Sequence, residues 1–178
     1  MKRLKSYILF ILLLLATVLP AHGHISRNMF MISNLNTDNG LSSSRVYSIV
    51  EAEDGAMWIS TKRGVDRYNG QLVSNYTLAT EMQYSDASGR NIKLTQDHHR
   101  QIYAYDNKGK VYIYNKVKDT FVLRCNLLNI LGGSIVLNEL LVDEKGNFWL
   151  AMDKGLYCLS ASADGKEIVR EKAKGRFI

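Results

Sequence analysis

One structural unit of about 45 residues recurs three times along this chain. Trp58, Tyr103 and Trp149 stand 45 and 46 positions apart, and each is followed six residues later by a glycine. These glycines are Gly64, Gly109 and Gly155. Repeats of roughly 40 to 45 residues that contain four short strands are typical of β-propeller blades. The spacing therefore predicts an all-β fold with three four-stranded antiparallel blades.

The first copy shows its four strands most clearly. Runs rich in β-branched and aromatic residues cover 46–50, 57–61, 65–68 and 72–76. Gly55 supplies a turn, as Gly146 does in the third copy, and Asn69-Gly70 suits a type I′ hairpin. The corresponding runs are 92–95, 102–105, 111–114 and 120–125, then 135–142, 148–152, 156–159 and 167–171. We therefore place blade 1 at 40–78, blade 2 at 90–126 and blade 3 at 134–172, with a helical turn at 127–133.

Three blades are too few for a ring. A propeller removes its exposed strand edges by closing a circle of about 4 to 8 blades. The segment Asn28–Ile32 precedes the first repeat and is expected to be an unpaired outer strand, offered to the last blade of a complete ring. We therefore predict an incomplete propeller, from a truncated or split protein, whose partners are further blades or another protein chain.

The N-terminus has the features of a secretory signal peptide. Lys2, Arg3 and Lys5 precede an apolar run at 7–18, and small residues at 21 and 23 fit a signal-peptidase site. The run is shorter than the ~20 residues of a membrane-spanning helix. We interpret 1–23 as a cleaved leader and 24–178 as a periplasmic or secreted chain without a stable membrane span. An uncleaved anchor is the alternative.

Charge and cysteine content restrict the partners. Removing the leader lowers the formal net charge from +6 to +3, and the only cation-rich stretch is the mixed tail at 166–176. Nucleic acid is therefore not expected as a partner. Cys125 and Cys158 both lie in the exported part, where a disulfide is permitted, although their strand-like contexts favour small buried hydrophobes.

The first and third copies carry a recognisable set of residues. In the first copy these are Gly40-Leu41-Ser42-Ser43-Ser44, Val46, Ile49, Gly55, Trp58-Ile59-Ser60-Thr61, Gly64-Val65 and Arg67-Tyr68. In the third they are Asp143, Gly146, Phe148-Trp149-Leu150, Gly155-Leu156 and Tyr157. Both sets resemble the two-component regulator propeller repeat.

The chain also departs from that repeat. The family usually has Asp six residues before the Trp, a position held by Asp97 and Asp143 but by Ala52 in the first copy. The second copy has Tyr103 in place of Trp and Arg100 in place of the turn glycine. These changes weaken the resemblance of the second copy without disturbing its strand pattern.

The resemblance implies a periplasmic sensor. Such repeats typically open the sensor half of hybrid two-component systems in glycan-degrading bacteria, ahead of a β-sandwich, a membrane helix and a histidine kinase. We therefore expect a ligand-sensing or recognition module that lacks its own kinase and responds to a glycan. The alternatives are a non-catalytic propeller portion of an exported polysaccharide-degrading enzyme and a self-associating scaffold.

No catalytic or cofactor motif is present. We find no His-Glu-x-x-His, Gly-x-Ser-x-Gly, phosphate-binding glycine loop or Cys-x-x-Cys, so we expect neither an enzyme nor a cofactor. His98 and His99 form the one pair that would interest a metal, but adjacent histidines are expected to point to opposite sides. A solvated turn without a metal is the favoured interpretation.

The recurrent aromatic residues are expected in the core. Trp58, Tyr103 and Trp149 occupy one position per blade, as packing between neighbouring sheets requires, whereas a sugar-stacking platform would need exposed rings. Tyr105, Tyr112 and Tyr114 alternate in facing within one blade, so some of these three are expected outside the core. 

A ligand-binding rim is expected on the loops that join strand two to strand three and strand four to the next blade. Charged and amide side chains there suit hydroxyl-rich or acidic oligosaccharides, with ordinary solvated turns as the alternative. The residues of this rim are Arg45, Lys62, Arg63, Asn107, Lys108, Asp153 and Lys154.

Overall fold

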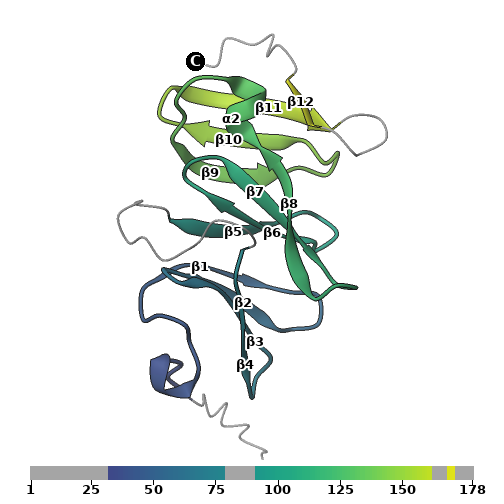
Figure 1. Cartoon of the computed structure of the whole chain (residues 1–178). Coiled ribbons are helices and arrows are strands. Elements are labelled where there is room, and N and C mark those ends of the chain that lie inside the picture. The colour runs from purple at the N-terminus through teal and green to yellow at the C-terminus, as the bar shows by residue number, and fades with distance from the viewer. Residues whose placement is uncertain (1–31, 79–90, 162–167, 171–178) are drawn as a thin grey trace, which may run out of the picture. The chain divides into compact units, whose positions relative to one another are not determined.

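The computed structural model describes residues 32–78, 91–161 and 168–170. Its strands all lie in the compact unit formed by residues 34–178. Figure 1 shows three antiparallel sheets that follow one another in chain order, called blades 1, 2 and 3 below. Each blade is a meander, because strands adjacent in sequence are adjacent in the sheet. The fold is therefore all-β, and the described sheets do not close into a ring.

The strands agree with the runs read from the sequence to within two residues at either end. Blade 1 contains β1 (Val46–Glu51), β2 (Met57–Thr61), β3 (Gly64–Tyr68) and β4 (Val73–Tyr76). Blade 2 contains β5 (Ile92–Gln96), β6 (Ile102–Asp106), β7 (Lys110–Asn115) and β8 (Thr120–Asn126). Blade 3 contains β9 (Leu137–Val142), β10 (Phe148–Met152), β11 (Gly155–Ala161) and β12 (Ile168–Arg170). A 3-10 turn, η1 (Thr37–Asn39), precedes blade 1, and helix α2 (Leu127–Leu131) joins blades 2 and 3.

The strand register shows that the three blades are built on one plan. The recurrent aromatic residue sits on the second strand of each blade, opposite a residue of the first strand. Trp58 pairs with Val50, Tyr103 with Thr95 and Trp149 with Leu141. Residues at equal distance from these pairs are therefore structurally equivalent between blades.

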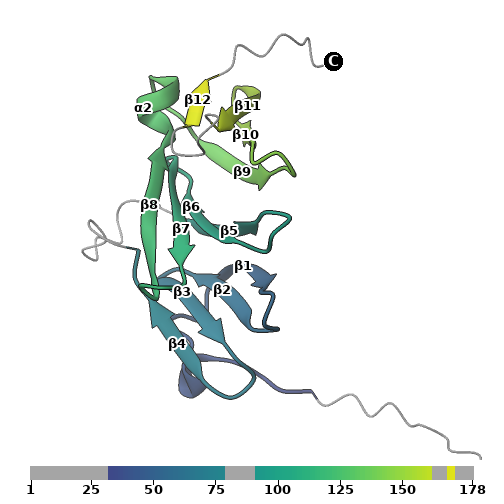
Figure 2. The ribbon, with the colours of Figure 1, turned by 90° about the vertical axis from the view of Figure 1, so that its right-hand side faces the viewer.

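Two apolar clusters hold the blades together. The first interface, between blades 1 and 2, contains the buried side chains of Trp58, Val65, Leu78, Ile92, Leu94, Ile102, Ala104, Tyr112 and Phe121. The second interface, between blades 2 and 3, contains those of Tyr103, Tyr105, Val111, Leu127, Leu137, Leu140, Val142, Phe148, Leu150 and Leu159. We call the face of a blade that packs on the following blade its forward face, and the opposite one its back face. Strands β1, β5 and β9 follow one another along one side of the stack (Figure 2), and β5 contacts both of the others.

The chain ahead of β1 folds back onto blade 1 through a buried carboxylate. Asp66, 0% exposed in β3, accepts hydrogen bonds at Oδ2 from the Ser42 backbone N–H (2.9 Å) and hydroxyl (2.8 Å). Its Oδ1 accepts from Asn75 Nδ2 (2.8 Å), which also donates to the Gly40 carbonyl (3.1 Å). The Gly40–Ser44 run of the repeat therefore anchors the incoming chain to the blade.

Two turn positions depend on left-handed backbone. Gly64 begins β3 with φ of +150°, and a Cβ there would lie 2.6 Å from the Tyr76 carbonyl oxygen. The turn between the first and second strands contains Gly55 and Gly146 in blades 1 and 3, with φ of +76° and +79°. Arg100 takes this position in blade 2 with φ of +60°, a conformation that glycine adopts without strain.

Parts of the N-terminal prediction lie outside the described residues. The signal peptide at 1–23 and residues 28–31 of the expected outer strand belong to this undescribed part. Ile32, the last residue of that segment, is described, belongs to no strand and is 97% exposed.

The structure tests two expectations about the aromatic residues and corrects one of them. Trp58 and Tyr103 are buried as expected, but Trp149 is only partly buried, because neither apolar cluster covers its face of blade 3. Tyr105 and Tyr112 are both buried, and Tyr114 packs against the first interface. Blade 2 is covered on both faces, so Tyr105 and Tyr112 belong to the core, whereas Tyr114 is only partly buried and lies outside it, which confirms the expectation for one of the three tyrosines.

The structure also shows how the two histidines and the two cysteines singled out in the sequence are arranged. His98 and His99 lie in the turn between β5 and β6 with ring centroids 3.6 Å apart, so they do not point to opposite sides as expected. Strand alternation does not apply in a turn, which explains the difference. Cys125 is not bonded to Cys158 and packs, partly buried, against the second interface. Burial raises the pKa of the Cys125 thiol to about 11.

Candidate functional site

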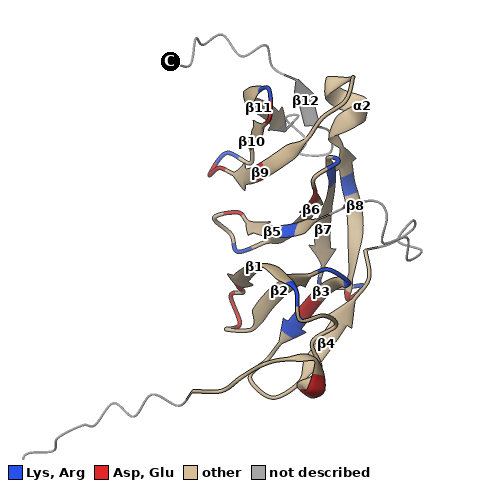
Figure 3. Cartoon of the chain, turned by 90° about the vertical axis from the view of Figure 1, so that its left-hand side faces the viewer, with Lys and Arg blue, Asp and Glu red and all other residues tan. Residues whose placement is uncertain are grey.

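The predicted rim residues lie on one edge of the three blades. Lys62 and Arg63, Asn107 and Lys108, and Asp153 and Lys154 occupy the turns β2–β3, β6–β7 and β10–β11, and Arg45 precedes β1. Figure 3 shows acidic and basic residues in turns of all three blades. The structure therefore brings the seven residues to a common edge, spread over three successive turns.

Backbone hydrogen bonds tie this rim to the starts of the first strands. The N–H of Lys62 donates to the Arg45 carbonyl (3.0 Å), and the Asn107 carbonyl accepts from the N–H of Leu137 (2.9 Å) in the next blade. The N–H of Asp153 donates to the Val136 carbonyl (3.3 Å). These contacts give the rim turns a structural role in addition to the ligand contact expected from the sequence.

One pair of rim residues lines a small pocket. Asp153 and Lys154 border a volume of about 120 Å³ beside the loop that follows α2, together with Gly133, Met152 and Tyr157 among others. The other five rim residues line neither this pocket nor the larger one described next.

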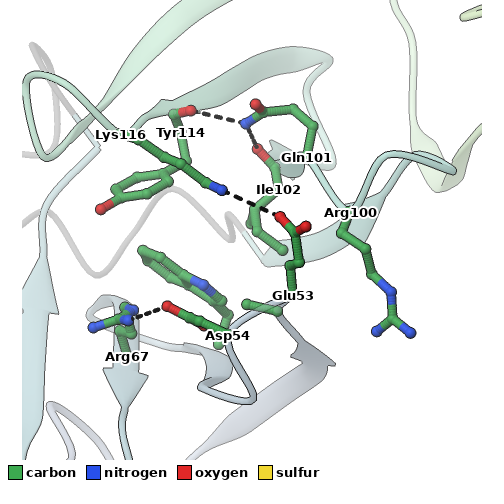
Figure 4. A pocket seen from close by; sticks show the side chains of 10 residues that line it. Glu53, Asp54, Arg67, Arg100, Gln101, Ile102, Tyr114 and Lys116 are labelled. Atoms are coloured by element: carbon green, nitrogen blue, oxygen red, sulfur yellow. Dashed lines mark hydrogen bonds and ion pairs between the residues drawn. The ribbon is translucent and has the colours of Figure 1, made fainter.

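A larger cavity of about 150 Å³ opens at the opposite edge, between blades 1 and 2. It is bordered by turns β1–β2, β5–β6 and β7–β8 and by the aromatic residues of the first interface (Figure 4). Its lining residues are Ala52, Glu53, Asp54, Trp58, Arg67, Arg100, Gln101, Ile102, Tyr114 and Lys116. Sequence reasoning missed this cavity. Ala52 and Arg100, however, are two of the positions at which the chain departs from the repeat, and both border it.

An arginine–carboxylate pair forms one side of the cavity. Arg67 Nη2 donates to Asp54 Oδ2 at 2.6 Å, and its guanidinium lies 5.8 Å from the centroid of the Trp58 ring. The backbone N–H of Ala56 (3.1 Å to Asp54 Oδ1) and the Arg67 hydrogen bond hold the pKa of Asp54 below its ordinary value. Burial alone would lower the pKa of Arg67, but its contacts with Asp54 outweigh burial and raise it. The pair is therefore charged at neutral pH.

Polar groups of blade 2, together with Glu53 of blade 1, border the other side. Lys116 Nζ lies 3.6 Å from Glu53 Oε2, and both side chains are largely exposed. Gln101 Nε2 donates to the backbone carbonyl of Tyr114 (2.8 Å), which fixes this amide at the wall. In Figure 4 the guanidinium of Arg100 points away from the centre of the cavity. Positively and negatively charged side chains and an amide therefore border the cavity.

Ring contacts and hydrogen bonds hold the aromatic wall of the cavity in place. The Trp58 ring packs tilted against Tyr76 (5.1 Å between centroids) and Tyr114 (4.5 Å) and edge-on to Phe121 (5.5 Å). The hydroxyls of Tyr76 (2.9 Å) and Tyr114 (2.6 Å) donate to the same oxygen of Asp119. Burial and these hydrogen bonds raise the pKa of both tyrosines. The shared carboxylate thus ties the outer strand of blade 1 to blade 2.

The groups that line this cavity are suited to noncovalent binding. Arginine, carboxylate, amide and indole groups around one cavity can hydrogen-bond and contact a polar ring. Within residues 32–78, 91–161 and 168–170, no cluster of three or more His, Cys, Asp or Glu side chains is placed to hold a metal ion. In the same residues no helix has the length and apolar character needed to span a bilayer.

Comparison with known proteins agrees with the repeat. Residues 40–63 match the family model described as "Two component regulator propeller", and they cover the start of blade 1 with its Ser42 anchor and the first two strands. No curated protein matches the chain significantly.

Solved structures from B. thetaiotaomicron have a similar fold. The extracellular domain named for a hybrid two component system superposes with a TM-score of 0.58 at 18% identity, over 82% of this chain and 19% of that one. A second such domain gives 0.52 at 20% identity over 78% and 17%, and one named for a one component system gives 0.54 at 20% over 74% and 17%. This chain therefore spans less than a fifth of the length of these structures. It has three blades of a propeller fold, and its first blade carries a match to the two-component regulator propeller repeat.

Proposed function

We propose that the chain is an extracytoplasmic recognition module of a two-component type of sensor, that its ligand is an oligosaccharide, and that it catalyses no reaction. The match of residues 40–63 to the two-component regulator propeller repeat carries this proposal. The similar structures are extracellular domains of signalling systems, which supports a location outside the cytoplasm. Export through the signal peptide at 1–23 belongs to the same proposal.

The cavity between blades 1 and 2 is the proposed ligand contact. Arg67, Asp54 and Gln101 offer charged and amide hydrogen-bonding groups beside the Trp58 and Tyr114 rings. A volume of about 150 Å³ suits one small polar ring or substituent of a longer glycan lying across the edge of the blades. The seven rim residues on the opposite edge remain the competing prediction for this contact.

Calorimetric titration of residues 24–178 with neutral and acidic oligosaccharides tests the proposal. The double variant Glu53→Ala/Lys116→Ala removes two exposed side chains of the cavity, so it should weaken binding by roughly tenfold or more while leaving the fold intact. The matched control Lys118→Ala changes a cation in the same turn that does not line the cavity, and it should bind as the wild type does.

The rim is tested in parallel with Lys62→Ala/Arg63→Ala. Loss of binding in this variant, with wild-type affinity in the cavity variant, would move the ligand contact to the rim. Absence of binding to every glycan would remove the oligosaccharide from the proposal. Release of new reducing ends from any glycan of the panel would contradict the non-catalytic assignment.

A further inference from the structure

A carboxylate closes the turn between the first and second strands of blade 3. Asp143 Oδ1 accepts hydrogen bonds from the backbone N–H groups of Lys145 (2.9 Å) and Asn147 (2.8 Å). Its other oxygen, Oδ2, accepts from Nε1 of the recurrent Trp149 (3.0 Å) and from Nδ2 of Asn147 (2.9 Å). The carboxylate therefore satisfies two turn N–H groups and also the polar hydrogen of the aromatic side chain.

The corresponding turn of blade 2 has the same arrangement. Asp97 Oδ1 accepts hydrogen bonds from the backbone N–H groups of His99 and Gln101, both at 2.9 Å. Asp97 Oδ2 accepts from the hydroxyl of Tyr103, the recurrent aromatic residue of this blade, at 3.4 Å. Two blades with different turn sequences therefore place an acidic oxygen at the same point beside the second strand.

Blade 1 keeps the aromatic donor but lacks the acceptor. Ala52 stands six residues before Trp58, where the other two blades have aspartate. Asp54 replaces part of the missing group, because its Oδ1 accepts from the Ala56 N–H (3.1 Å), but its Oδ2 is held by Arg67 at 2.6 Å. Within residues 32–78, 91–161 and 168–170, no group accepts a hydrogen bond from Trp58 Nε1.

The indole of Trp58 borders the cavity between blades 1 and 2. Trp58 is 1% exposed, and Trp58 and Ala52 both line the volume of about 150 Å³. In blade 3 the side chain of Asp143 fills the equivalent space beside Trp149. A buried N–H without an acceptor costs free energy, and a ligand oxygen that reaches it recovers this cost.

We propose that this cavity binds a carboxylate, and that the ligand of the chain is an acidic oligosaccharide that contains a uronic acid. One oxygen of the uronate accepts from Trp58 Nε1, as Asp143 Oδ2 accepts from Trp149 in blade 3. The ligand thus supplies the group that Ala52 lacks. The oligosaccharide part of this ligand rests on the function proposed above, whereas the carboxylate part rests on the geometry of the three turns.

The charged side chains of the cavity favour an ionised acceptor over a neutral hydroxyl. Its border carries three cations and two carboxylates, which are Arg67, Arg100, Lys116, Glu53 and Asp54. Asp54 is paired with Arg67, which offsets its repulsion of an incoming anion. Arg100 points away from the centre (Figure 4), but the exposed Lys116 is held only by Glu53 at 3.6 Å and can turn to a ligand carboxylate. Hydrogen bonds to an ionised oxygen are also roughly twice as strong as neutral ones.

The indole N–H signals of residues 24–178 test the carboxylate contact directly. The chain has two tryptophans, so a nitrogen–proton correlation spectrum shows two indole signals, and Trp149→Phe assigns them. Trigalacturonate should move the Trp58 signal downfield, toward the position of the carboxylate-bonded Trp149 signal. Its methyl ester, which has the same rings but no charge, should leave the Trp58 signal in place. Acetate serves as a free carboxylate without a sugar.

Ala52→Asp restores the carboxylate of the other blades and should therefore compete with the ligand. In this variant the Trp58 signal should lie downfield without ligand, and calorimetry should show affinity for trigalacturonate reduced by about tenfold or more. Trp58→Phe removes the donor and should weaken binding similarly. The matched control Val117→Asp adds the same charge at a 96% exposed residue outside the cavity lining and should behave as the wild type does. Circular dichroism establishes that each variant is folded.

The three ligands separate the carboxylate from the oligosaccharide. Equal affinity for trigalacturonate and its methyl ester would overturn the carboxylate and leave the oligosaccharide in place. A Trp58 signal that moves with acetate, in a chain that binds no glycan, would support the carboxylate and remove the oligosaccharide from the proposed function. A Trp58 signal that no carboxylate moves, or that stays in place in folded Ala52→Asp, would overturn the inference.

Discussion

Trp58 of blade 1 and Trp149 of blade 3 occupy one register position in very different surroundings. Trp58 is 1% exposed, because the aromatic residues of the first interface surround it. Trp149 is partly buried, and its Nε1 donates to Asp143 Oδ2 (3.0 Å) in the turn of its own blade. Blade 1 has Ala52 in place of that aspartate. The repeat thus fixes where the indole sits, whereas the neighbouring sheet determines how deeply it is buried.

Replacing each of the two tryptophans by alanine is expected to give the largest difference in stability between the two blades. Trp58→Ala should lower the free energy of unfolding by roughly 3–5 kcal/mol, because it opens a cavity in a packed interface. Trp149→Ala should cost roughly 1–2 kcal/mol, since a partly exposed ring has less packing to lose. Urea unfolding followed by circular dichroism measures both losses. Equal losses would show that the two rings are equally buried in solution.

Adding a methyl group to equivalent turn glycines of the same two blades gives the next largest effect. Both Gly64 and Gly155 have positive φ, at +150° and +132°, so alanine is strained by about 1–2 kcal/mol at either position. At Gly64 the new Cβ would also meet the Tyr76 carbonyl oxygen at 2.6 Å, whereas nothing lies within 4 Å at Gly155. Gly64→Ala should therefore destabilise the chain more than Gly155→Ala by about 1 kcal/mol or more in the same assay. A larger cost at Gly155 would contradict this view of blade 3.

The pH dependence of the free energy of unfolding also distinguishes the two tryptophans, with a smaller expected effect than the two substitutions above. Burial alone would raise the pKa of Asp143, but hydrogen bonds from Trp149 and Asn147 outweigh it and hold the pKa below the ordinary value of 3.8. Because the folded pKa lies below the unfolded one, this stabilisation is present above the unfolded pKa and is lost as pH falls through the folded pKa.

Urea unfolding between about pH 5 and pH 2 measures that loss. Trp149→Phe and Asp143→Asn should each flatten the decrease of stability with falling pH. Trp58→Phe should leave the slope as it is in the wild type, because blade 1 has no carboxylate six residues before its tryptophan. An unchanged slope in Trp149→Phe would contradict the role of the indole N–H.

The smallest effect is expected in the middle blade, at the turn that holds Gly55 in blade 1 and Gly146 in blade 3. Arg100 has φ of +60° there, and this left-handed backbone costs a non-glycine residue about 1–2 kcal/mol. Relief of that strain in Arg100→Gly exceeds the greater freedom of glycine in the unfolded chain, so the free energy of unfolding should rise by about 0.5–1 kcal/mol. The control Arg124→Gly, within strand β8, should destabilise the chain instead. A destabilising Arg100→Gly would mean that contacts such as the one from Arg100 Nη1 to the Glu51 carbonyl (3.4 Å) outweigh the strain.

Much of this fold could be predicted from local patterns. Strand positions follow from alternating apolar residues and from turns such as Asn69-Gly70, both of which are short-range properties of the sequence. The depth of burial could not be predicted, because it depends on which sheet lies next to a given face. Tyr105 and Tyr112 illustrate this, since alternation sends them to opposite faces and the neighbours of blade 2 cover both.

The cavity was harder to predict than the rim, for a geometric reason. Rim residues belong to turns whose edge is fixed by strand order alone, so their common location could be predicted. The cavity forms where turns of two blades meet, and Asp54, Gln101 and Lys116 come from segments that only the packing of blades brings together. Ala52 and Arg100 were visible as departures from the repeat, but a departure alone does not reveal what faces it.

The Ser42–Asp66 contact has a mechanical consequence. Tension applied to the chain ahead of residue 40 would reach blade 1 at β3, through a carboxylate held by three hydrogen bonds, before it reached β1. Pulling would therefore shear this anchor against a central strand, and β1 would be shielded from being peeled away from β2. A tether to this end of the molecule can transmit force into the body of the sheet without unzipping its edge.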